Sequence, residues 1–106
     1  MKNRYKIPGH IRQFVKAELM NYEDNKRRLN NFPGDTRSLL IASTRIAQIE
    51  NVLNALNKED REAAEIIFMD HYTQAGAEVA KGLSKDAYYN AMNKIIYLTA
   101  REMGQI

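Results

Sequence analysis

A run of regularly spaced apolar residues in the middle of the chain constrains the fold most strongly. Between residues 36 and 57, apolar side chains recur at alternating steps of three and four. They are Leu39, Ala42, Ile46, Ile49, Leu53 and Leu56. This heptad seam lies on one side of a predicted helix about 30 Å long, at ~1.5 Å per residue. Such a seam fits either an intramolecular core or a homodimer interface.

A second long helix is predicted before this one, from about Pro8 to Asn30. Proline is tolerated in the first turn of a helix, and apolar residues follow it at helical spacing. Pro33 lies among residues that end the helix, and Asp35 or Thr36 can cap the next one. Because the loop is short, the two helices are expected to form an antiparallel hairpin.

Three further helices are predicted in the second half of the chain. Asn57 can cap a helix that ends near Tyr72. A short helix over residues 74–81 is broken by Gly82, and Ser84 can cap a last helix that ends before Gly104. The buried stripe of this last helix is expected to hold Tyr88, Ala91, Ile95, Leu98 and Met103.

The predicted elements fall into two parts. Residues 1–57 form the basic N-terminal helical hairpin, with the heptad seam as a surface for dimerisation. Residues 58–106 are expected to form a second part of three helices. The fold class is therefore predicted to be all-α.

Basic residues are concentrated in the first third of the chain. Residues 1–34 carry eight Lys/Arg against three Asp/Glu, whereas residues 58–106 carry six against eight. Lys26, Arg27 and Arg28 form a run of cations and are candidate phosphate contacts. Solvation of a helix face is the alternative explanation for them.

The composition argues against catalysis and against a membrane span. The chain has no Cys, and its two histidines, His10 and His71, lie in different predicted helices, so no zinc site is expected. His71 is instead expected at the edge of the core. No Gly-rich phosphate loop, nucleophile elbow or long apolar run occurs. We expect a soluble intracellular protein that is not an enzyme and that binds no cofactor or metal.

A short helix, a turn containing glycine and a capped second helix are the layout of a helix-turn-helix. In this motif the second helix enters the major groove, with its N-terminal residues toward the base edges. Asn can bond adenine in bidentate fashion, Lys can reach guanine or a phosphate, and a capping Ser directs its hydroxyl and nearby N–H groups at a phosphate. Residues 58–106 are therefore predicted to be a helix-turn-helix DNA-binding domain. The predicted contacts to double-stranded DNA are Lys81, Ser84, Lys85, Tyr89, Asn90, Asn93 and Lys94.

Nearly the whole chain resembles the phage late-gene transcriptional activators called RinA and the related ArpU group. The resemblance is carried by "IRQFVKAELMNYEDNKRRL" (11–29), "EIIFMDHY" (65–72), "LSKDAYYNAMNKII" (83–96) and "AREMG" (100–104). It implies a C-terminal domain like the promoter-reading domain of sigma factors, and activity in the cytoplasm of a bacterial host. Two features depart from the family pattern: the acid Asp86 in the first turn of the last helix, and the weakly basic helix before it.

A different class of function also fits the sequence. Acidic residues gather early in the helix after Asn57. The chain could therefore be a helical adaptor that binds a host protein such as RNA polymerase without contacting bases. Binding to duplex DNA that weakens with salt separates the two hypotheses.

Overall fold

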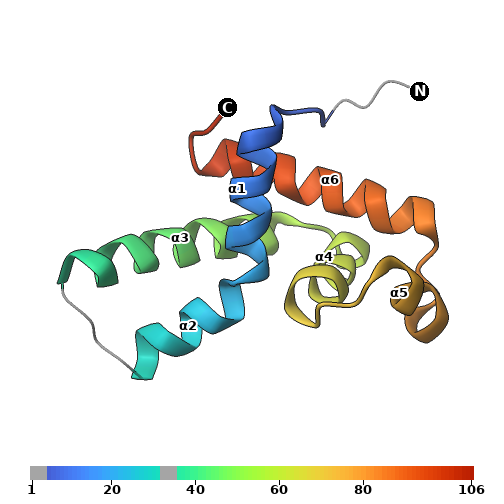
Figure 1. The fold of residues 1–106 in the computed structure, drawn as a ribbon, viewed down its shortest axis with the longest axis horizontal. Coiled ribbons are helices and arrows are strands. Elements are labelled where there is room, and N and C mark those ends of the chain that lie inside the picture. The colour runs from blue at the N-terminus through green and yellow to red at the C-terminus, as the bar shows by residue number, and fades with distance from the viewer. Residues whose placement is uncertain (1–4, 32–35) are drawn as a thin grey trace.

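The computed structural model describes residues 5–31 and 36–106, and these residues contain helices and no strand. The helices are α1 (Gly9–Met20), α2 (Tyr22–Asn31), α3 (Thr36–Ala55), α4 (Lys58–Ala64), the π-helical η1 (Glu65–Met69), α5 (Gln74–Lys81) and α6 (Lys85–Glu102) (Figure 1). The all-α prediction is confirmed. The loop expected around Pro33, with the cap Asp35, lies outside the described residues.

The single helix predicted from Pro8 to Asn30 is wrong, because the chain turns at Asn21 and forms α1 and α2. The two helices follow different neighbours: α1 packs on α6 and η1, whereas α2 lies along α3 (Figure 1). Tyr22 fixes the start of α2, since its buried hydroxyl donates to Glu50 Oε2 on α3 at 2.7 Å. One straight helix could not pack both on α6 and along α3.

The heptad seam of α3 faces the interior of the molecule. Ile46 and Ile49 are buried, and Leu53 and Leu56 pack against the same core. The helices that cover this side of α3 are α2, α4 and α6. The four seam residues from Ile46 to Leu56 are therefore intramolecular core and are not free to form a dimer interface, whereas Leu39 and Ala42 are half-buried.

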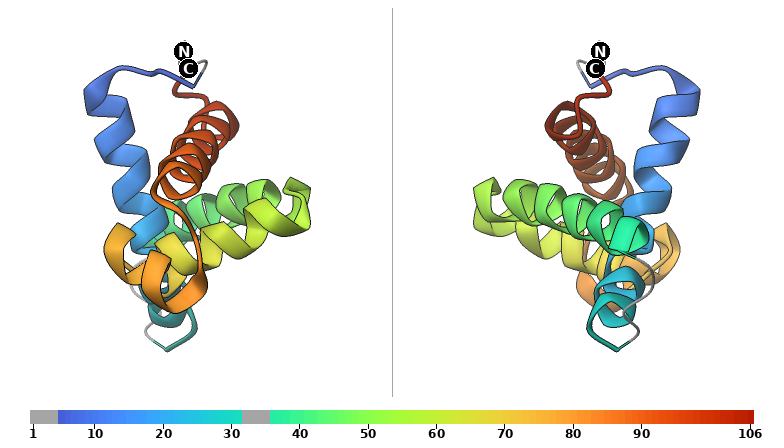
Figure 2. Two further views of the ribbon diagram at one scale, coloured as in Figure 1. Left: turned by 90° about the vertical axis from the view of Figure 1, so that its right-hand side faces the viewer. Right: turned by 90° about the vertical axis from the view of Figure 1, so that its left-hand side faces the viewer.

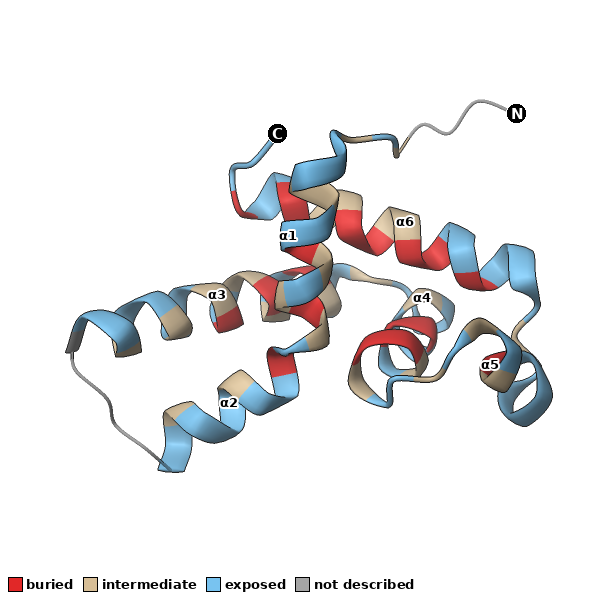
Figure 3. Cartoon of the chain, viewed as in Figure 1, coloured by how far each residue is buried: buried red, intermediate tan, exposed pale blue. Residues whose placement is uncertain are grey.

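Helix α6 is the central element of the packing, since it contacts α1, α3, α4 and α5. The predicted stripe is confirmed, with Leu98 half-buried and the other four residues buried (Figure 3). Its buried face is wider than expected, because Met92, Ile96 and Ala100 are also covered. Residues from both predicted parts of the chain, 1–57 and 58–106, contribute to one core cluster.

The helix predicted after Asn57 begins as expected, because the Asn57 side chain accepts a hydrogen bond from Asp60 N–H at 2.8 Å. It continues into η1, and His71 follows with φ 59°. A left-handed residue commonly ends a helix, and here the Tyr72 N–H reaches back to Ile66 O at 3.0 Å. This conformation leaves His71 exposed, so its expected place at the edge of the core is wrong.

Candidate nucleic-acid interface

The turn between α5 and α6 is built around Gly82. Its φ of 68° is left-handed, a conformation that glycine adopts without a steric penalty. The Gly82 N–H bonds Glu78 O and the Leu83 N–H bonds Ala77 O, both at 3.2 Å. Leu83 also packs against the core that contains Ala77. The bond from Gly82 is the one that defines an αL helix C-cap, and together with the Leu83 bond and the apolar contact it ends α5 and fixes the direction of the chain into α6.

Both helices of the candidate site begin with a side-chain cap. The Thr73 hydroxyl accepts from Gly76 N–H at 3.1 Å, and the Ser84 hydroxyl accepts from Ala87 N–H at 3.2 Å. The predicted Ser84 cap is confirmed. The first backbone N–H groups of α6, at Lys85 and Asp86, have no partner within the helix and carry its positive dipole end.

A buried tyrosine attaches the start of α6 to the chain ahead of α5. The Tyr88 hydroxyl donates to Tyr72 O at 2.8 Å, and burial raises the pKa of Tyr88. The ammonium of Lys81 lies 5.6 Å from the centre of the Tyr72 ring. The same contacts that orient α6 therefore also hold an exposed cation of α5 beside it.

Three of the predicted contacts are exposed on the first turns of α6: Lys85, Tyr89 and Asn90. Lys85 and Tyr89 lie on the side of α6 that later turns bury through Met92 and Ile96. They stay exposed because α6 begins beyond the point where α1 crosses it (Figure 1), next to α5 (Figure 2, left). The start of α6 thus projects a lysine, a phenol and an amide together with the Lys81 ammonium.

Two of the predicted DNA contacts, Asn93 and Lys94, are less exposed to solvent than a DNA-facing side of α6 should be. Both are half-buried. Lys94 Nζ lies 2.6 Å from Asp60 Oδ2, and this ion pair connects α6 with α4. The placement of Lys94 on the exposed arc is therefore wrong, because Asp60 from a neighbouring helix binds its ammonium.

Acidic side chains also lie on this surface. Asp86 and Glu78 are both exposed, and Asp86 follows Lys85 in the first turn of α6. At ~100° per residue, Asp86 falls between Tyr89 and Asn90 around the helix. A phosphate would be repelled at this point, whereas the exocyclic amine of cytosine could donate to the carboxylate.

The predicted phosphate contacts of α2 lie elsewhere. Figure 1 shows α2 and the start of α6 toward opposite ends of the longest axis, which measures 44 Å. Lys26 pairs with Glu50 and Arg27 with Asp24, each at 3.4 Å, while Arg28 lines a shallow hollow beside Arg27. The α2 cations and the helix-turn-helix residues therefore do not form one site.

The fold adds one cation that was not among the predicted contacts. Arg12 Nη2 lies 3.7 Å from Met92 Sδ, so the half-buried guanidinium reaches α6. It lies on the same side of α6 as Lys85 and Tyr89, about one to two turns further along. No sequence pattern identifies this residue, because the contact depends on how α1 crosses α6.

Comparisons of the chain with known protein families, with curated protein sequences and with solved structures find no match. Within the described residues, no group of three or more His, Cys, Asp or Glu side chains is placed to hold a metal ion. None of the described helices is both long and apolar enough to cross a membrane.

Proposed function

We propose that this chain is a transcriptional regulator that binds duplex DNA through the helix-turn-helix formed by α5, the Gly82 turn and α6. The observation that carries the proposal is the projecting start of α6. It is capped by Ser84, oriented by the Gly82 turn and by Tyr88, and exposes Lys85, Tyr89 and Asn90 beyond the body of the molecule. Major-groove recognition requires an exposed helix N-terminus of this kind.

The exposed residues have separate roles in this proposal. The side-chain amide of Asn90 contacts a base edge, where Asn forms its favoured bidentate pair with adenine. The ammonium groups of Lys81 and Lys85 neutralise phosphates and fix the register of the protein on the duplex. Tyr89 contributes a phenol that can bond a phosphate or pack on a sugar. Asn93 lies a turn further along and contacts DNA only if the groove closes around α6.

The resemblance to the RinA and ArpU activators supports a phage or prophage setting, a bacterial cytoplasm and activation of late genes through host RNA polymerase. The same resemblance supports the division into an N-terminal helical hairpin and a three-helix DNA-binding domain. In this arrangement α4 with η1, α5 and α6 form the trihelical unit. The N-terminal helices buttress α6 from its other side.

The direct test is selection of bound fragments from the source genome, followed by measurement of affinity for the selected site. Asn90→Ala should weaken binding to that site by about 1–3 kcal/mol and leave non-specific affinity nearly unchanged. Asn30→Ala, which removes an exposed amide from α2, serves as the matched surface control. If no fragment is enriched over random DNA, base recognition by α6 is refuted.

A second candidate function is the helical adaptor, and one observation favours it. A hollow of about 300 Å³ is lined by Glu23, Glu65 and Asp70, with Arg61, Tyr22, Leu53 and Met69. Three carboxylates above apolar side chains suit an Arg or Lys of a partner protein. If the chain binds RNA polymerase but no duplex DNA at low salt, this candidate replaces the first.

A further inference from the structure

Large apolar side chains are exposed on the first half of α3. Leu40 is 67% exposed and Ile41 is 56% exposed. Phe14 of α1 adds a partly exposed ring beside them, because the Arg45 guanidinium of α3 lies 5.1 Å from the centre of that ring. Clustered apolar residues of this size are unusual on the solvated surface of a small protein.

The outward side of α3 also lacks the charges that a solvated helix normally carries. Over residues 38–55 the sequence contains only two charged residues, Arg45 and Glu50. Both have partners within the molecule, Phe14 and Gln48 for Arg45 and Tyr22 for Glu50. The exposed positions on this side of α3 between Ile41 and Ala55 are Ser43, Thr44, Ala47, Asn51 and Asn54. Surface helices of globular proteins usually present charged residues instead, so this face is suited to burial.

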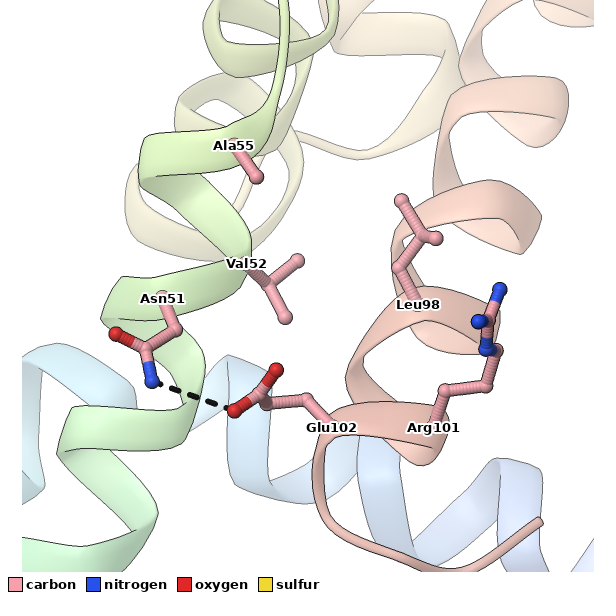
Figure 4. Close-up of a pocket in the computed structure, with 6 residues that line it drawn as sticks. All are labelled: Asn51, Val52, Ala55, Leu98, Arg101 and Glu102. Atoms are coloured by element: carbon pink, nitrogen blue, oxygen red, sulfur yellow. Dashed lines mark hydrogen bonds between the residues drawn. The ribbon is translucent and has the colours of Figure 1, made fainter.

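The second half of α3 borders a hollow between α3 and α6 (Figure 4). The hollow measures about 290 Å³. Val52 and Ala55 of α3 and Leu98 of α6 provide its apolar walls, while Asn51, Arg101 and Glu102 form a polar rim. The Asn51 amide donates to Glu102 Oε2 at 3.3 Å, which holds one side of the rim in place. This space is large enough for an aliphatic side chain.

We propose that the outward face of α3 is a homodimer interface, in which two copies pack α3 against α3 in antiparallel fashion around Ala47. Leu40 lies seven residues before Ala47 and Ala55 lies eight residues after it, so each is about 10–12 Å from the two-fold axis. Two-fold symmetry then places Leu40 and Ile41 of each copy at the hollow of the other. The small side chain of Ala47 allows the helix axes to approach to about 8–10 Å.

Charge complementarity supports a second copy as the occupant. Arg45 lies two residues before Ala47 and Asn51, the partner of Glu102, lies four residues after it. The same two-fold axis therefore brings the guanidinium of Arg45 near the carboxylate of Glu102 of the other copy. Two equivalent ion pairs at the rim and two apolar insertions at the hollows make the face self-complementary.

The seam residues from Ile46 to Leu56 take no part in this interface, because they already form the intramolecular core. The inference also does not depend on DNA binding, since the α3 face and the start of α6 are separate surfaces. One helix face is smaller than the ~1,600 Å² of a standard interface, so we expect a dissociation constant in the micromolar range.

The first test is sedimentation of the full chain over a range of concentration up to about 200 µM, well above a micromolar dissociation constant. The parent should shift from monomer to dimer, and Leu40→Glu should weaken association by at least about tenfold. Val79→Glu is the matched control, because Val79 is an apolar residue on α5 that is 88% exposed. Circular dichroism should report the same melting temperature for all three. A parent that stays monomeric throughout, or a Leu40→Glu variant that associates like the parent, overturns the proposal.

The second test measures the register of the pair. The chain has no Cys, so Ala47→Cys introduces a single thiol at the proposed two-fold axis. Facing Cα atoms there fall within the ~4.4–6.8 Å that a disulfide spans, and diamide can accept the two electrons and two protons released by the two thiols. Ala47→Cys should form a covalent dimer at least about tenfold faster than the Val79→Cys control. Equal rates would show that the copies do not meet at Ala47.

Discussion

Substitutions in the Lys94–Asp60 ion pair distinguish an effect on folding stability from an effect on DNA binding. The two side chains join α6 to α4 with an Nζ to Oδ2 distance of 2.6 Å, and their exposures are 34% and 20%. Replacing Lys94 by alanine removes the ammonium and leaves the Asp60 carboxylate in a largely covered position. The expected primary effect of Lys94→Ala is therefore a loss of folding stability.

The size of that loss follows from the partial burial of the pair. Exposed ion pairs contribute about 0.2–1 kcal/mol, whereas hydrogen bonds to charged groups contribute about 1.5–3 kcal/mol. An intermediate value of about 1–2 kcal/mol corresponds to a melting temperature lowered by roughly 5–10 °C for a domain of this size. Lys85→Ala, at an exposed position on the same helix, should change stability by less than about 0.5 kcal/mol.

Urea denaturation followed by circular dichroism measures these changes, and a double-mutant cycle with Asp60→Ala isolates the pair. The cycle should give a coupling energy near 1 kcal/mol. Affinity for duplex DNA should fall more in Lys85→Ala than in Lys94→Ala, because the Lys94 ammonium is already paired. A coupling energy below about 0.3 kcal/mol, with DNA binding lost in Lys94→Ala, would refute this reasoning.

Three further predictions concern the turn and the helix contacts. Gly82→Ala should lower stability by about 1–2 kcal/mol in thermal melts, because alanine is strained at φ 68° even though no neighbouring atom obstructs its Cβ. The control Gly9→Ala, in open space at the start of α1, should not destabilise the protein. Tyr88→Phe should cost about 1 kcal/mol by removing the hydrogen bond to Tyr72 O, and faster amide exchange at α5 but not at α3 would report the loosened turn. Tyr22→Phe should change the acid dependence of stability. The hydrogen bond from Tyr22 holds the pKa of Glu50 below its ordinary 4.5, so the contribution of this contact is present above pH 4.5 and is lost as pH falls through the lowered value. Urea titrations from pH 7 to about 3 should therefore show a shallower loss in the Phe variant, and identical slopes would contradict the role of this hydrogen bond.

Local signals predicted the helix caps and the glycine stop in the second half of the chain, for a physical reason. The caps at Asn57 and Ser84 and the stop at Gly82 act through hydrogen bonds and backbone angles within a few residues. Such features depend little on the rest of the fold, so sequence identifies them. The buried stripe of α6 was also predictable, because helical periodicity alone selects one side of the helix.

The remaining features depend on tertiary packing. Asn21 lies within a continuous apolar pattern, and the chain turns there only because α1 and α2 follow different neighbours. The exposure of Lys94 could not be predicted from the sequence, because it depends on the packing of α4, which places Asp60 beside it. Likewise, Arg12 reaches α6 from a helix about eighty positions away in the chain. Contacts of this kind leave no periodic signal in the sequence.

The salt dependence of binding to duplex DNA tests the proposed role of the start of α6 most directly. If Lys81, Lys85 and Arg12 each neutralise a phosphate, log affinity should fall with log salt at a slope of about −2.7. That slope corresponds to a loss of about 40-fold between roughly 50 and 200 mM salt. Lys85→Ala should reduce the slope by about one unit, whereas Lys58→Ala, an exposed lysine at the start of α4, should leave it unchanged. An affinity that does not change with salt concentration, or a slope that Lys85→Ala and Lys58→Ala alter equally, would contradict DNA binding by the start of α6.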